Sequence, residues 1–325
     1  MDNLIQTLIH ATSQSMIERA PAEDQLAAWG KQQQFHSMLL QIYLQSSLDL
    51  KVRSLAIIVL KNGVSKYWRK GASFGIVEQE KLEIRKLLLL RFNEPSKQLA
   101  AHQAVVISKI ARFDCPTFWP DLLPSLLHLV QSSFTDAKNI TISKCEQYNA
   151  LYTLHLSMKQ VAARPLPAAR EILRQIAPEV FAFMHAILKN RISLFKAGVQ
   201  SGEEHDSLDF SLSIARIALK CMRRLIYNGF SSILQTADPL NFLESATKFL
   251  QEFLEYRVTF NGSKAMLANF SSLSILIGKA LLDLQMNDFR SFVLVPGCRN
   301  VLKFYFYLLQ QTTHSTGEII VPYFR

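Results

Sequence analysis

The chain has 325 residues, of which 49% are hydrophobic, and 36 lysines and arginines against 26 aspartates and glutamates give it a formal net charge of +10. Gly and Pro occur only 11 times each and Phe 21 times, which excludes a disordered or low-complexity chain and supplies ample core material. The length exceeds that at which one globular core usually stops growing, so we expect a long repeat stack or two domains.

Membrane insertion and export are not expected. No uninterrupted apolar run approaches the ~18 to 20 residues that a membrane-spanning helix needs. Residues 1–4 lack the positive region and small-residue cleavage pattern of a secretory signal, which predicts an intracellular protein. The cysteines lie far apart without a Cys-x-x-Cys pair, as expected of reduced, buried thiols rather than a disulfide framework or zinc site. They are Cys115, Cys145, Cys221 and Cys298.

The positive charge is spread along the chain, with its densest part within residues 61–91. Excess positive charge can attract acidic proteins, nucleic acid or anionic lipid. Alternatively, the charged side chains only keep the outer faces of helices solvated. No arginine-glycine run, lysine-rich tail or aromatic RNA-binding motif accompanies it. Solvated helix faces and an acidic protein partner therefore remain as the two readings, and nucleic-acid binding is not favoured.

Apolar residues three and four apart predict a succession of amphipathic helices. Side-chain acceptors, Asp49 first among them, stand where helices would begin, and no segment alternates with a period of two. The sequence thus predicts an all-helical protein. In chain order, the stripes cover residues 52–60, 99–110, 122–129, 172–187, 208–226, 242–253 and 266–284.

The stripes recur at intervals of about 47 to 61 residues, whereas HEAT units, which are paired helices, run ~40 to 47 residues. We assign five anchor residues to the first helices of successive pairs, with the extra length in loops such as residues 197–207. The pattern favours an elongated, irregular helical solenoid. The anchors are Val52, Leu99, Leu151, Leu212 and Phe270.

Residues 112–124 place Trp119 among three prolines, Pro116, Pro120 and Pro124. Each proline fixes φ and removes a backbone donor, so this run can end one helix and start the next but cannot lie inside either. We therefore expect a corner between two helices of one repeat, plugged by the Trp119 ring.

This corner resembles the Trp-Pro-acidic-Leu-Leu-Pro signature of the importin-β superfamily, where it joins the two helices of the third HEAT repeat. Residues 52–70 are similar to the second repeat of that family, with a Val-Arg, an aliphatic helix, a Leu-Lys-Asn and then Trp68 after basic residues. Three further segments resemble the importin-11 type: Phe-Asn-Glu-Pro at 92–95, Ala-Arg-x-Asp-Cys-Pro at 111–116 and Arg-Arg-Leu-x-x-Asn-Gly-Phe at 223–230.

The resemblance implies a right-handed α-solenoid of antiparallel HEAT-repeat helix pairs, with an N-terminal domain over residues 1–95 and about four further repeats over 96–325. It implies a nuclear transport receptor, or the N-terminal fragment of one, that shuttles between cytoplasm and nucleus. Its partners would be the GTPase Ran in its GTP state, Phe-Gly repeat proteins of the nuclear pore and protein cargo. Since such receptors have some twenty repeats, we expect the stack to be truncated at its C-terminal end.

In this family the second helices of the first repeats clasp Ran. Lys81 and Arg85 are four residues apart on one helix face, where like charges repel unless an acidic surface comes opposite. The alternative is that Asn62 caps or bends a helix end and the lysines are merely solvated. The candidate contacts are Lys61, Asn62, Lys66, Arg69, Lys81 and Arg85.

An exposed apolar C-terminal end is also expected, from Val301, Phe304, Tyr305, Phe306, Tyr307, Leu308 and Leu309. Trp68 and Trp119 are expected to be structural plugs.

We find no enzyme motif: no His-Glu-x-x-His, P-loop, Gly-x-Ser-x-Gly or phosphate-binding glycine loop. The acidic run at residues 203–206 is better explained as the start of a helix than as a metal site, so no cofactor or metal is expected. Two alternatives to a transport receptor remain: a HEAT scaffold with another function, and an exportin-like carrier of tRNA or other RNA.

Overall fold

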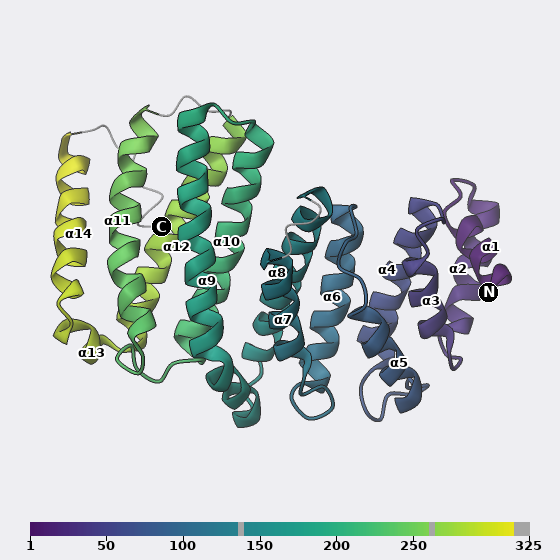
Figure 1. The fold of residues 1–325 in the computed structure, drawn as a ribbon. Helices are drawn as coiled ribbons and strands as arrows, with labels where there is room; N and C mark the ends of the chain where they lie inside the picture. The colour runs from purple at the N-terminus through teal and green to yellow at the C-terminus, as the bar shows by residue number, and fades with distance from the viewer. Residues whose placement is uncertain (136–139, 260–263, 315–325) are drawn as a thin grey trace. The chain divides into compact units, whose positions relative to one another are not determined.

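The structure, a computed structural model, describes residues 1–135, 140–259 and 264–314. Every element of secondary structure in these residues is an α-helix, which confirms the predicted all-α class (Figure 1). The chain divides into two compact units, Met1–Arg164 and Pro165–Arg325.

The first unit is built from antiparallel helix pairs. Within it α1 packs on α2, α3 on α4, and α7 on α8, while α4, α6 and α8 pack on one another in succession. One layer of the unit therefore consists of the second helices of successive pairs, as in a helical repeat stack. The helices are α1 (Asp2–Ala11), α2 (Met16–Trp29), α3 (Phe35–Leu44), α4 (Leu50–Tyr67), α5 (Glu78–Leu88), α6 (Lys97–Asp114), α7 (Leu122–Thr135) and α8 (Ile140–Ala162).

Local signals place the ends of these helices. The Asp49 carboxylate accepts the Lys51 N–H at 2.7 Å, which confirms it as the N-cap of α4. At α6 the cap is Ser96, whose hydroxyl accepts the Leu99 N–H at 3.4 Å.

The predicted phase of the repeats is wrong by one helix. Val52, Leu99 and Leu151 lie on α4, α6 and α8, which are the second helices of their pairs. The corner at residues 115–121 consequently connects one pair to the next, because α6 packs on α4 and α8 and α7 packs on α8. Hydrophobic spacing gives the period of a repeat but not which of two amphipathic helices comes first.

The second unit continues the pattern with longer helices. Its elements are α9 (Pro167–Ser201), α10 (His205–Asn228), α11 (Ala237–Thr259), α12 (Lys264–Asn287), α13 (Phe289–Leu294) and α14 (Gly297–His314). Here α9 packs on α10, α10 on α12, and α11 on both α12 and α14. The predicted loop at residues 197–207 is mostly helical. It shrinks to a tight turn at Gly202, whose φ of 71° suits a residue without a side chain.

Helix α12 is long and apolar enough over Met266–Asn287 to cross a bilayer by length and composition, a property the sequence analysis did not anticipate. Buried core helices of helical proteins have the same length and composition. In this unit α12 packs on α10 and α11 and carries the buried Asp283, which pairs with Arg223 of α10. We therefore interpret α12 as a core helix.

The predicted apolar end of the chain is partly buried. Val301 and Phe304 lie in the core of the second unit, Tyr305 is half-buried, and Phe306 is 66% exposed. The side chains of Tyr307, Leu308 and Leu309 lie outside the described residues.

Candidate partner-binding surface

The residues that carry the family resemblance form contacts between neighbouring helices of the first unit. Arg53 of α4 forms an ion pair with Glu94 and donates its Nε–H to the Tyr43 carbonyl at 2.9 Å. Asn149 of α8 donates to the carbonyls of Phe92 and Glu94 at 2.8 and 2.9 Å. The Arg53–Tyr43 contact joins the two helices of one pair. The Arg53–Glu94 and Asn149 contacts, in contrast, satisfy buried polar groups of one pair with groups of the next and so stabilise the stack.

A second buried cluster joins α4, α5 and α6. The Trp68 ring is 1% exposed and donates its Nε1–H to Asp114 Oδ1 at 2.9 Å. Arg85 donates to Asp114 Oδ2 at 2.6 Å and to Glu78 Oε1 at 2.5 Å. Trp68 is therefore a structural residue.

Arg85 does not lie on an accessible surface, contrary to our expectation of a docking residue. Its side chain is 5% exposed, and the acidic groups that offset its charge belong to this chain. Asp114 is 29 residues further along, so helix periodicity alone did not reveal this partner.

Trp119 is buried at 8% exposure in the α6–α7 corner, where its carbonyl accepts the Cys115 thiol at 3.2 Å. Pro116 and Pro120 lie in the corner and Pro124 in the first turn of α7, where no intrahelical N–H bond is lost.

The accessible face of α4 holds three of the predicted contacts. Lys61 is half-buried and Asn62 and Lys66 are exposed. On the neighbouring α6, Lys109 donates to the Ser65 hydroxyl of α4. Burial and then the nearby Lys61 charge lower the pKa of Lys109 and of His102, so these groups share one positive field.

We call this region the α4–α6 basic surface, comprising Lys61, Asn62, Lys66, His102 and Lys109. Within the described residues none of its three lysines has a carboxylate partner within ion-pair distance. Sequence reasoning missed His102 and Lys109. Their spacing of seven residues, two helical turns, was an available signal that they share a face of α6.

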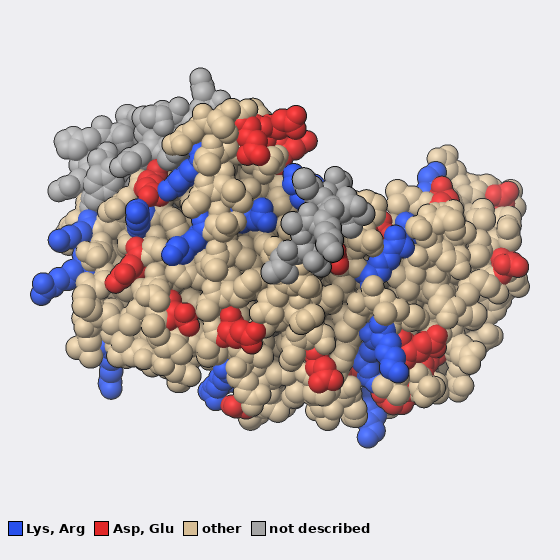
Figure 2. Space-filling model, viewed as in Figure 1, with Lys and Arg blue, Asp and Glu red and all other residues tan. Residues whose placement is uncertain are grey.

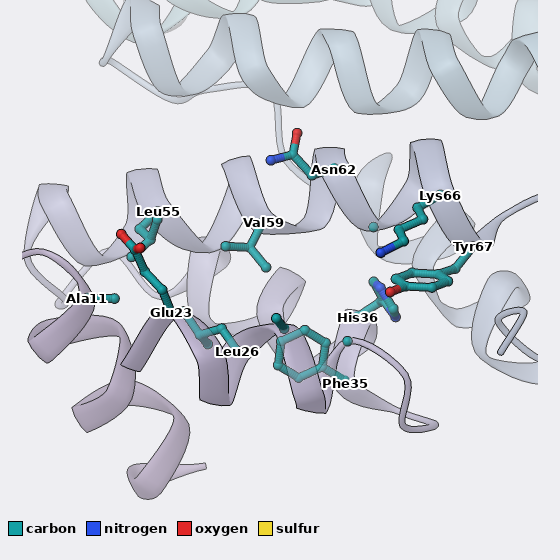
Figure 3. A pocket seen from close by; sticks show the side chains of 13 residues that line it. Ala11, Glu23, Leu26, Phe35, His36, Leu55, Val59, Asn62, Lys66 and Tyr67 are labelled. Atoms are coloured by element: carbon teal, nitrogen blue, oxygen red, sulfur yellow. The ribbon is translucent and has the colours of Figure 1, made fainter. Parts of the chain in front are cut away.

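Beside this surface, a pocket of about 290 Å³ opens between α2, α3 and α4 (Figure 3). Leu26, Phe35 and Val59 form apolar walls. In Figure 3 the Lys66 side chain lies close to those of His36 and Tyr67. Such a pocket suits an apolar side chain of a partner, with the Lys66 ammonium at its rim.

Arg69 and Lys81 lie elsewhere, in a pocket of about 630 Å³ between the α4–α5 loop and the α6–α7 corner. We call it the loop pocket and define it by Arg69, Lys70, Ile76, Lys81, Phe113 and Phe118. The six predicted contacts thus separate into the α4–α6 basic surface, the loop pocket and the buried Arg85. Figure 2 shows one group of Lys and Arg side chains, next to Asp and Glu, over the region of α5.

No group of three His, Cys, Asp or Glu side chains within the described ranges is arranged to hold a metal. In the acidic run before α10, Glu203 accepts the Ser207 hydroxyl at 3.1 Å. This contact lies at the start of α10, where acidic side chains are favoured.

Comparison with known proteins identifies the family. Residues 22–101 match the family model for the importin-beta N-terminal domain. The chain is 34% identical to importin-11 of Homo sapiens over 280 residues, which are 86% of this chain and 28% of that protein. It is 33% identical over 235 residues to importin beta-like protein kap113 of Schizosaccharomyces pombe, or 71% of this chain and 23% of that protein.

The chain belongs to the importin-β superfamily. It corresponds to the N-terminal portion of an importin-11-like member and spans about 28% of the length of the importin-11 relatives. This membership agrees with the prediction that the chain is not an enzyme.

Solved structures support the same fold. The chain superposes with a TM-score of 0.76 on Lph2, described as a bidirectional nuclear transport receptor of S. cerevisiae, at 25% identity over 92% of this chain and 28% of that one. It superposes on the exportin Cse1 in its cargo-free state with a TM-score of 0.69, at 16% identity over 95% of this chain and 32% of that one. The predicted stack of HEAT-repeat helix pairs is confirmed.

Proposed function

We propose that this chain is the Ran-binding portion of an importin-11-like nuclear transport receptor and that it captures Ran in its GTP state. The observation that carries the proposal is the α4–α6 basic surface. Its α4 residues, Lys61, Asn62 and Lys66, lie within the segment that matches the importin-β N-terminal domain.

Electrostatics gives this surface a reason to bind an acidic protein. Lys61 and Lys109 are close enough for the charge of one to lower the pKa of the other. An acidic surface placed opposite would relieve this repulsion, and complementary charges also accelerate association. The adjacent pocket adds apolar contact area, which charge pairs on a rim do not supply.

The transport cycle is part of the same proposal. Ran-GTP in the nucleus would compete with, or strain, the cargo-bound form and release the load. The receptor would bind Phe-Gly repeat proteins of the pore as it carries cargo through. We propose import as the direction because of the likeness to importin-11. Cargo contacts fall outside this proposal, since the chain spans only part of its relatives' length.

The test compares two double variants: one in the α4–α6 basic surface and one control variant at two exposed arginines of the second unit. Lys61→Glu with Lys66→Glu reverses two charges on α4, and Arg170→Glu with Arg174→Glu reverses two exposed charges on α9 of the second unit. Binding of purified chain to Ran-GTP is measured by biolayer interferometry, with circular dichroism as the folding check. We expect the α4 variant to bind at least about tenfold more weakly, corresponding to about 1.4 kcal/mol, and the α9 variant to bind like the unaltered chain.

Undiminished capture by the α4 variant, or equal weakening in both variants, would remove this surface from the account. A HEAT scaffold with another function would not distinguish Ran loaded with GTP from Ran loaded with GDP. An RNA carrier would instead bind RNA with a steep dependence on salt concentration.

A further inference from the structure

The loop pocket presents two cations, Arg69 and Lys70, whose charge no carboxylate of the described residues offsets. Arg69 and Lys70 are exposed, and within the described part of the chain neither has a carboxylate within ion-pair distance. The two carboxylates in the pocket wall are already engaged. Glu78 contacts Lys81 and Arg85 with its two oxygens, and Asp114 accepts from Arg85 and Trp68.

Aromatic rings restrict the side chains of two cations in the loop pocket, Arg69 and Lys81. The Arg69 guanidinium lies 5.3 Å from the centre of the Phe113 ring, and the Lys81 ammonium lies 5.6 Å from the centre of the Trp68 ring. Such cation–π contacts restrict long, flexible side chains, so less conformational freedom is lost when an anion binds.

The remaining wall is apolar and partly exposed. Phe118 of the α6–α7 corner is 54% exposed although it is a large hydrophobic residue, and Ile76 and Phe113 lie alongside it in the pocket. A volume of about 630 Å³ is within the usual range of ligand sites. The pocket is therefore large enough for more than a single carboxylate.

We propose that the loop pocket binds an acidic peptide segment of a partner protein, with carboxylates on Arg69 and Lys70 and a bulky apolar side chain against Phe118. The mixed lining argues for this occupant: a bare anion would leave the aromatic wall exposed, and a purely apolar peptide would leave the cations without a counter-charge. This site is additional to the proposed Ran surface, with which its residues do not overlap.

The probe is a short fluorescein-labelled peptide in which glutamates surround two phenylalanines, followed by fluorescence anisotropy on the full chain. There are two control peptides. In the first, lysines replace the glutamates; in the second, alanines replace the phenylalanines. The pocket variants are Lys70→Glu and Phe118→Ala, and the matched control is Lys86→Glu, an exposed lysine of α5 outside the pocket.

We expect the acidic phenylalanine peptide to bind, the lysine peptide not to bind and the alanine peptide to bind several-fold more weakly. Lys70→Glu should weaken binding about tenfold and Phe118→Ala about threefold, with Lys86→Glu within about twofold of the unaltered chain. Binding should also fall as salt rises, because the charges are exposed.

Binding of the acidic peptide that is equal in Lys70→Glu and Lys86→Glu, or no binding at all, would overturn the proposal. Ran-GTP capture is measured on the same variants and should be unchanged in Lys70→Glu and Phe118→Ala. Peptide binding therefore tests the loop-pocket proposal and Ran-GTP capture tests the Ran proposal, so either proposal can be contradicted without the other.

Discussion

Glu80 shows how a single buried residue connects two helices. Its carboxylate, on α5, accepts the backbone N–H groups of Gln34, His36 and Ser37 at 2.8, 3.0 and 3.0 Å. These are N–H groups at the start of α3, which have no partner within the helix. A negative charge there is also favoured by the helix dipole, so Glu80 serves as a distant N-cap.

His36 is buried beside this carboxylate in its neutral form. Its ring is 2% exposed and lies against Gly63, where an added Cβ would come within 2.3 Å of Nε2. Burial lowers the pKa of His36 to about 4. The Glu80 carboxylate already accepts three N–H groups, and its Oε1 lies 4.0 Å from Nδ1, so it does not offset this effect.

The lowered pKa predicts a loss of stability in acid. Above pH 6.5 the imidazole is neutral in both the folded and the unfolded chain. Between pH 6.5 and about 4 only the unfolded chain takes up the proton, so the free energy of unfolding falls as pH falls, by about 2 kcal/mol at pH 5. Denaturant unfolding at pH 7 and pH 5 measures this difference.

The control for this prediction is His36→Gln. His185 on α9, whose pKa is also lowered to about 4, first by burial and then by the Lys189 charge, keeps its own acid sensitivity in the variant. We therefore expect the variant to lose less stability between pH 7 and pH 5 than the unaltered chain. An equal loss in the two proteins would show that His36 is not held neutral by the fold.

At the level of elements, α5 is fixed by charges on its buried side. Arg85 lies between Asp114 of α6 and Glu78 of its own helix, and Asp114 also bonds to Trp68 at the end of α4. Removing one member of a buried pair leaves the other charge without compensation, which usually costs more than the pair itself contributes.

Arg85→Met is therefore expected to lower the free energy of unfolding by about 3 to 5 kcal/mol. Lys86→Met, at the exposed neighbouring position, should change it by less than about 0.5 kcal/mol. Urea denaturation of the two variants makes the comparison. Similar midpoints for both would show that the Asp114 contact does not stabilise the stack.

Sequence periodicity was sufficient to predict that each segment is a helix. It was insufficient to predict which helices and side chains that helix contacts. The stripes at Val52, Leu99 and Leu212 each mark a real helix, yet each belongs to the second helix of a pair. The spacing of Lys81 and Arg85 placed both on one face of α5. Which of them is buried depends on Asp114, a contact between elements that helix spacing does not encode.

At the level of the whole molecule, the importin-β resemblance predicted the fold because its motif residues are the contacts between successive helix pairs. Arg53 with Glu94 and Trp68 with Asp114 are examples. The binding surface was harder to predict, since exposed lysines are not restricted by packing. The domain boundary at residue 95 stays a prediction; the family model ends at residue 101 and the first compact unit at Arg164.

Nucleotide discrimination is the most direct test of the central claim. Affinities of the purified chain for Ran loaded with a non-hydrolysable GTP analogue and for Ran loaded with GDP are measured side by side. We predict binding to the GTP form that is at least about a hundredfold tighter, corresponding to about 2.7 kcal/mol. Equal affinity for the two forms, or no binding to either, would contradict the account.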